Sequence, residues 1–240
     1  MGQIYAPRLA AMGFDPRTGT YAKEDPEKSQ LRKQAVSRLA LTARDPRLRA
    51  ELGKAAGAYL AGDIAALDPA WFDAGFRILI DQGGLGAAKV LADKALASQD
   101  PLFRPSALGA IAASGNADVA RWVLRDMTDA RLRRSERYGM IGGIVGSRET
   151  RDLGFAWIKS NGQELFAGSN GIFMASQLPG IVGGFCSAEK ADEIAALLRP
   201  RLARKTGALA LERTIERVRS CGILKDARGA ELSAAFTKTS

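Results

Sequence analysis

The chain has 240 residues, of which 46% are hydrophobic and 25% are charged, so it holds enough apolar material for a continuous core. It contains no histidine, which excludes Ser–His and Cys–His catalysis, His-ligated zinc and the H-E-x-x-H helix of zinc peptidases. The net charge of +9 suggests an acidic partner.

Basic and acidic residues alternate closely along the chain, which is typical of solvated helix surfaces. No block of five like charges occurs, and no aromatic residues are interleaved with the arginines as a base-stacking surface requires. We therefore expect no nucleic-acid partner, and a basic solenoid that binds nucleic acid is the minor alternative. The neighbouring pairs of opposite charge include Arg44-Asp45, Arg125-Asp126, Glu136-Arg137, Glu212-Arg213 and Glu216-Arg217.

The spacing of apolar residues predicts helices along nearly the whole chain. An apolar stripe covers residues 31–40, and a second apolar face covers residues 71–80. Asp68-Pro69 is a helix cap followed by proline at the first helical position, and Gly83-Gly84 is expected to end the helix that follows. Further helices are predicted over residues 87–96, 101–113, 117–127, 130–145, 150–159, 188–204 and 209–221.

This pattern predicts an all-α fold. Alternation of period two over a strand length is absent, β-branched residues are sparse, and Ala and Leu dominate. Short turns between the helices indicate stacked antiparallel helical hairpins that form a HEAT- or armadillo-like α-solenoid. We predict an irregular lead-in over residues 1–26, because residues 13–20 are rich in turn formers, and a single helical-repeat domain over residues 27–240.

Residues 165–188 carry no charge and are long enough to span a bilayer. They also contain Ser, Asn, Gln and Pro residues and several glycines, and an unpaired polar group costs several kcal/mol in lipid. We therefore predict two buried pieces separated by a break at Pro179-Gly180, and no membrane span. The first 12 residues contain no apolar signal core, so no export signal is expected there.

Two matches to an enzyme signature are better explained as helix caps. Ser187-x-x-Lys190 and Lys205-Thr206-Gly207 match two parts of the penicillin-binding signature, but they are separated by only about four helical turns. Ser187 is predicted to be an N-cap and Gly207 a left-handed cap. We predict no catalytic residue and no metal site in this chain.

Cys186 and Cys221 are predicted to lie at helix boundaries in adjacent helices. Antiparallel neighbours bring the start of one helix beside the end of the next, so a disulfide between them is geometrically reasonable. Two buried free thiols are the alternative. A disulfide would favour a periplasmic or exported protein, whereas free thiols would favour the cytoplasm, and the sequence leaves the compartment open.

Five short stretches follow one another in the order and spacing of a known domain. They are residues 12–16 with Leu31-Arg32, residues 100–110, residues 154–161 (GFAWIKSN), residues 185–189, and Leu211-Glu212 with Ile215. In order, they are similar to the elements "LGW…LR", "R…ALG", "aWxFlkxN", "F-s-t-e" and the closing helix of that domain. On these stretches, over roughly residues 8–225, the chain resembles the C-terminal helical domain of aminopeptidase N-type zinc metallopeptidases (gluzincin aminopeptidases).

The resemblance implies a fragment of a longer enzyme, without the catalytic domain. Such a domain encloses the peptide chamber, controls substrate access and supports the catalytic domain of the same polypeptide. Zinc is then expected only in that catalytic domain, and no cofactor is expected in this chain. The alternative is a stand-alone HEAT-like scaffold that binds a protein or peptide in its concave groove.

Arginines on a concave face would attract the C-terminal carboxylate of a peptide substrate through charge-assisted hydrogen bonds. The candidate peptide-binding residues are Arg121, Arg125, Arg133 and Arg134. The family often has an R-x-Q-D element at this point, whereas here Arg134-Ser135 is followed by Glu136-Arg137. No role of that Gln-Asp pair is therefore transferred.

Overall fold

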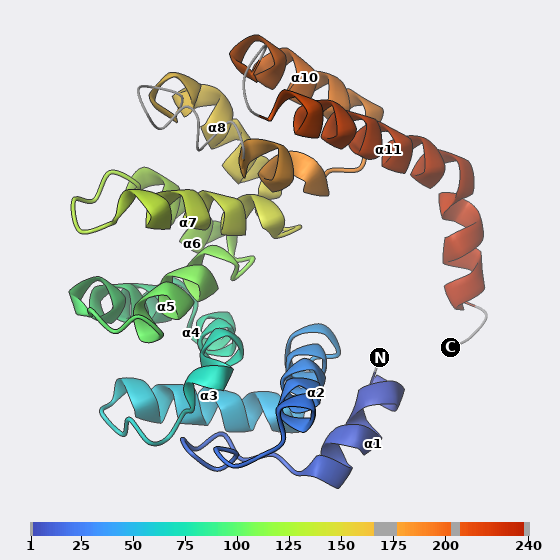
Figure 1. Cartoon of the computed structure of the whole chain (residues 1–240). Coiled ribbons are helices and arrows are strands. Elements are labelled where there is room, and N and C mark those ends of the chain that lie inside the picture. The colour runs from blue at the N-terminus through green and yellow to red at the C-terminus, as the bar shows by residue number, and fades with distance from the viewer. Residues whose placement is uncertain (1, 166–176, 203–206, 238–240) are drawn as a thin grey trace. The chain divides into compact units, whose positions relative to one another are not determined.

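A computed structural model describes residues 2–165, 177–202 and 207–237 (Figure 1). Helices, turns and loops account for all of these ranges, and none of them contains a strand, so the all-α prediction is confirmed. The chain divides into two compact units, Met1–Ile144 and Val145–Ser240. The single domain expected over residues 27–240 and its HEAT-like arrangement stay predictions.

Unit 1 contains α1 to α6 and most of α7. Within it, α1 packs on α2, α3 packs on α4, and α4 packs on α5 and α6. The bounds are α1 (Gly2–Met12), α2 (Pro26–Ser37), the π-helix η1 (Arg38–Thr42), α3 (Pro46–Leu60), the 3-10 helix η2 (Pro69–Trp71), α4 (Phe72–Ala97), α5 (Phe103–Ala112), α6 (Ala117–Arg125) and α7 (Arg134–Gly146).

Three helices of unit 1 begin with an aspartate followed by a proline. Asp25, Asp45 and Asp68 each accept backbone N–H groups of the first turn of α2, α3 and η2. A proline at the first helical position loses no hydrogen bond, and the carboxylate satisfies donors that the helix leaves free. The cap predicted at Asp68-Pro69 is therefore confirmed.

The helical range of α4 is interrupted at Gly84, as the Gly83-Gly84 pair predicts. Gly84 has φ 57° and ψ −145°, a conformation that residues with a Cβ rarely adopt. The residues before and after Gly84 therefore form two helices, and the second contains the helix predicted over residues 87–96.

An aromatic cluster forms the core between α3, α4 and α5. The ring centroid of Tyr59 lies 5.0 Å from that of Phe72 and 5.7 Å from that of Phe103. The ring centroids of Phe76 and Phe103 are 5.6 Å apart. Each such pair adds about 0.5–1.5 kcal/mol beyond the burial of its area. Three consecutive helices are thus joined into one packed block.

The segment predicted as an irregular lead-in instead begins with a helix, because α1 occupies Gly2–Met12. Leu9 is buried and α1 packs against α2, so tertiary packing stabilises a helix that has no long apolar stripe of its own. Residues 13–25 do form the expected turns, with positive φ angles of 70° at Gly13 and 82° at Gly19.

Unit 2 contains the end of α7 and, among its described residues, four further labelled elements and a short helical stretch over residues 177–181. The helices predicted over residues 150–159, over the described part of 188–204 and over 209–221 are present, but the end predicted at residue 221 is wrong, because the last helix continues to Thr237. Within this unit α10 packs along α11. The bounds are α8 (Arg151–Leu165), the 3-10 helix η3 (Val182–Gly184), α10 (Ala188–Leu202) and α11 (Ala208–Thr237).

The first buried piece predicted in the uncharged segment falls mainly on residues 166–176, outside the described residues. Residues 177–181 are helical and run into η3, so the break predicted at Pro179-Gly180 is wrong. Leu178 and Val182 are fully buried on either side, and this packing outweighs the low helix propensity of the pair. In the described ranges, no helix has the length and apolar character needed to cross a membrane.

Candidate functional site

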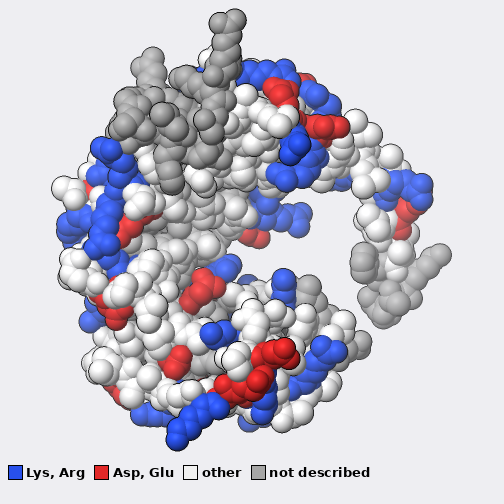
Figure 2. All heavy atoms as spheres, in the orientation of Figure 1, with Lys and Arg blue, Asp and Glu red and all other residues white. Residues whose placement is uncertain are grey.

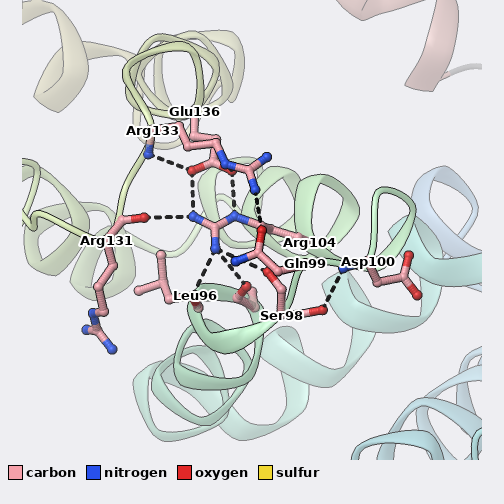
Figure 3. A network of polar contacts seen from close by, with 9 residues as sticks. Leu96, Ser98, Gln99, Asp100, Arg104, Arg131, Arg133 and Glu136 are labelled. Carbon is pink, nitrogen blue, oxygen red and sulfur yellow. Dashed lines mark hydrogen bonds and ion pairs between the residues drawn. The ribbon is translucent and has the colours of Figure 1, made fainter.

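Arg104 lies in the first turn of α5 and is only 3% exposed. Its Nε and Nη2 donate to the two carboxylate oxygens of Glu136 on α7, at 2.6 and 2.9 Å (Figure 3). Nη1 donates to the carbonyls of Leu96 at 2.9 Å and Ser98 at 3.3 Å, and Nη2 donates to the carbonyl of Arg131 at 2.7 Å. The planar guanidinium therefore joins α7, the end of α4 and the loop before α7.

Glu136 also caps α7. Its Oε2 accepts a hydrogen bond from the backbone N of Arg133 at 2.8 Å, one half of a capping box. The hydrogen bonds from Arg104 hold the pKa of Glu136 below its ordinary value, against the opposing effect of burial, and Glu136 in turn raises the pKa of Arg104. Both groups are charged at neutral pH, so the pair crosslinks the fold and is unsuited to proton transfer.

The candidate residues Arg121 and Arg125 lie one turn apart on α6 and are 61% and 72% exposed. Each contacts an acidic neighbour: Arg121 Nη1 lies 2.9 Å from Asp118 Oδ1, and Arg125 Nε lies 3.2 Å from Asp126 Oδ1. Exposed ion pairs of this kind are weak, so a peptide carboxylate would compete with the existing partners at modest cost.

The other two candidates lie where α7 begins. Arg133 directly precedes α7, and its Nη2 donates to Gln99 Oε1 at 2.8 Å, whereas Arg134 is the first residue of the helix. The four arginines therefore occupy two places in unit 1, and peptide binding by them stays a prediction. Lys and Arg are mixed with Asp and Glu over the face seen in Figure 2, as the interspersed charge of the sequence predicts.

In unit 2 the structure joins Cys186 and Cys221 by a disulfide, with 5.0 Å between the two Cα atoms. Cys186 lies just before α10, as predicted, but Cys221 lies in the interior of α11 and not at a helix boundary, since α11 continues to Thr237. The next residue, Gly222, approaches so closely that a Cβ there would lie 2.7 Å from the Cα of Ser187. The start of α10 is therefore fixed against α11 by a covalent bond and by a close contact between backbones.

The cap interpretation of Ser187 is confirmed, because its Oγ accepts a hydrogen bond from Lys190 N at 3.0 Å. Lys205 and Thr206 lie outside the described residues, and Gly207 has the positive φ of 100° that a left-handed cap requires.

The described residues bring together no set of zinc ligands. The sequence has no histidine, and its two cysteines are joined to each other. Across the described ranges, no three His, Cys, Asp or Glu side chains are grouped so that they could hold a metal ion.

The family model described as the ERAP1-like C-terminal domain matches residues 1–220. The chain belongs to the ERAP1-like C-terminal domain family. This is a C-terminal domain of aminopeptidase N-type enzymes, without the catalytic domain, so the resemblance seen in the sequence is confirmed. A comparison with curated protein sequences gave no match.

Within this ERAP1-like domain, the partnership of Arg104 and Glu136 does not follow from the sequence pattern. The interspersed charge predicts a solvated helix surface for Glu136-Arg137, which is wrong for Glu136, since that carboxylate pairs with an arginine 32 positions earlier. Arg137 instead donates to the carbonyl of Asp129 at 3.1 Å. The available signal was the stretch from Asp100 to Arg104, which resembles the family but does not identify its partner.

Proposed function

We propose that the chain is a non-catalytic C-terminal domain of a zinc aminopeptidase, which encloses the peptide chamber and controls substrate access. The family match over residues 1–220 carries this proposal, together with a sequence that contains no histidine for a gluzincin site. The zinc and the catalytic groups then belong to another part of the same polypeptide, and this chain supports them.

The buried Arg104–Glu136 pair supports the structural part of the proposal. A wall of a chamber must keep its loops in place, and this pair ties α5 and α7 to two connecting segments at once. A fully bonded buried guanidinium stabilises one arrangement of those segments over others.

We assign peptide recognition to Arg121, Arg125, Arg133 and Arg134. A C-terminal carboxylate accepts two parallel N–H bonds from a guanidinium, and Arg121 and Arg125 are well exposed. Replacing either α6 arginine by glutamine in the longer enzyme should weaken its dependence on peptide length, and Arg77→Gln, which removes one positive charge from α4, is the matched control. An unchanged length preference would remove these residues from the proposal.

The experiment that tests the proposal is an immunoblot of the native protein with an antibody raised to this chain. A band several times larger than 25.5 kDa is expected, because the catalytic domain is then on the same polypeptide. A band at the size of the chain would overturn the proposal and favour the stand-alone scaffold that binds a protein or peptide.

We infer that the protein works in an oxidising compartment, the periplasm or the cell exterior, because the Cys186–Cys221 disulfide persists where thiols are not kept reduced. Thiol labelling of freshly lysed cells, with and without reductant, tests this inference. Two labelled cysteines without reductant would place the protein in the cytoplasm instead.

A further inference from the structure

A pocket of about 380 Å³ lies in unit 1 between α1, η1 and the start of α3. Its volume falls within the range of about 300–1,000 Å³ that is typical of small-molecule sites. Four apolar side chains from these elements and from the turn after α1 line it: Leu9, Phe14, Leu39 and Leu48.

The polar groups of this pocket are two carboxylates and one guanidinium, from Asp45, Glu51 and Arg47. The Asp45 carboxylate already has a hydrogen-bond donor, because its Oδ1 accepts a hydrogen bond from the backbone N–H of Leu48 at 2.9 Å as the cap of α3. Glu51 is partly buried, and no described residue donates a hydrogen bond to its carboxylate. The pocket therefore has one negative group that remains free to bind a ligand.

The surroundings of Glu51 shift its pKa in opposing directions. Burial raises the pKa of Glu51, the charge of Arg47 lowers it, and the nearby Asp15 raises it further. The Asp15 carboxylate is itself occupied, since it accepts the backbone N of Arg17 at 2.8 Å. Among the residues that line the pocket, the two carboxylates of Asp45 and Glu51 outnumber the single guanidinium of Arg47, so a positive ligand is favoured over an anion.

We propose that this pocket binds a small organic cation, an alkyl- or arylammonium ion, whose ammonium group pairs with Glu51. Its apolar body would lie against Leu9, Phe14 and Leu48. A charge-assisted hydrogen bond to a partly buried carboxylate is stronger than one in water, and the apolar wall adds affinity in proportion to the area covered. The site is distinct from the arginines to which we assign peptide recognition.

Isothermal titration of the 240-residue chain with 2-phenylethylammonium chloride tests the proposal. Glu51→Gln should weaken binding about tenfold, since a charge-assisted hydrogen bond is lost. Glu216→Gln, the same charge change at an exposed position of unit 2, should leave binding unchanged. The anion 3-phenylpropionate has a similar shape and should not bind measurably.

A second variant keeps the test independent of Glu51. Ala10 is an exposed residue of α1 that lines the pocket, so Ala10→Phe should fill the space and abolish binding with the fold retained. The proposal would be overturned if the wild-type chain did not bind the cation or bound the anion equally well. It would also be overturned if either pocket variant bound the cation as tightly as the wild type. None of these results bears on the size of the native polypeptide, so the proposed function is tested separately.

Discussion

The two units of this ERAP1-like domain hold their connecting segments by different chemistry. Unit 1 uses the buried Arg104, which joins α5 to Glu136 of α7 and to four backbone carbonyls. Unit 2 uses the Cys186–Cys221 disulfide, which joins the start of α10 to α11. The ionic crosslink depends on protonation and on complete hydrogen bonding, whereas the covalent one depends on the redox state of its surroundings.

A second buried arginine in unit 1 also pairs with a glutamate and a backbone carbonyl. Arg32 on α2 is 2% exposed, pairs with Glu24 and donates to the carbonyl of Met12 at 2.8 Å. Its guanidinium also lies 3.9 Å from the ring centroid of Tyr21. Arg32 fastens the lead-in to the adjacent helix, whereas Arg104 connects elements 32 positions apart, so the same chemistry serves a local and a long-range contact.

The largest effect is expected from Arg104→Met. It should lower the free energy of unfolding by about 3–5 kcal/mol, because it leaves the buried Glu136 carboxylate without its partner. Urea denaturation measures this loss, and hydrogen exchange should become faster around residues 95–105 and 131–141. The matched control, Arg121→Met, removes an exposed ion pair and should change stability by less than about 1 kcal/mol.

A double variant sharpens this prediction. Arg104→Met combined with Glu136→Leu removes both charges, so it should be less destabilised than the sum of the single variants. An Arg104→Met variant as stable as Arg121→Met would show that unit 1 is not crosslinked by this pair.

The next largest effect is expected in unit 2. Replacing Cys186 and Cys221 together by alanine should reduce stability by about 2–4 kcal/mol, since the unfolded chain is no longer constrained across the loop. Hydrogen exchange should become faster in α10 and α11 and stay unchanged in unit 1. Reducing agent should reproduce the effect on the wild-type chain and have none on the double variant. Equal hydrogen-exchange protection of α10 with and without the disulfide would show that the disulfide does not hold α10 against α11.

The smallest effect is a pH dependence specific to Glu136. Because its pKa is lowered in the folded state, its contribution is present above the ordinary glutamate pKa of about 4.3 and is lost as the pH falls through the lower folded value. The difference in melting temperature between wild type and Glu136→Gln should therefore be constant near neutral pH and shrink below about pH 4.

The control for this pH dependence is Glu212→Gln in unit 2. Glu212 also has a lowered pKa, through its hydrogen bond with Arg199, but the pair is exposed and solvent screens it. The difference in melting temperature between wild type and Glu212→Gln should be small at every pH. A difference for Glu136→Gln that grows on acidification would show that the carboxylate is not stabilised in its charged form.

Most helices could be predicted from the sequence because their signals are local. The Asp68-Pro69 cap, the interruption at Gly84 and the Ser187 cap are each formed within a few residues, and the structure has all three. The family could also be inferred from the sequence, because the order of short stretches survives even where each stretch alone is weak. The absence of histidine excluded a large class of catalytic chemistry from composition alone.

Only the tertiary structure decided which distant groups meet. Nothing near Glu136 in the sequence indicates that its partner is Arg104, and α1 forms without a long apolar stripe because it packs against α2. The helical stretch at Pro179 contains the fully buried Leu178, and this burial is decided by the tertiary structure. Many helix starts are determined by a capping side chain that bonds to a backbone N–H two or three residues later. The capping residue can therefore be recognised in the sequence. Partners across the fold are determined by burial, which makes an ion pair strong only after many other contacts have excluded water.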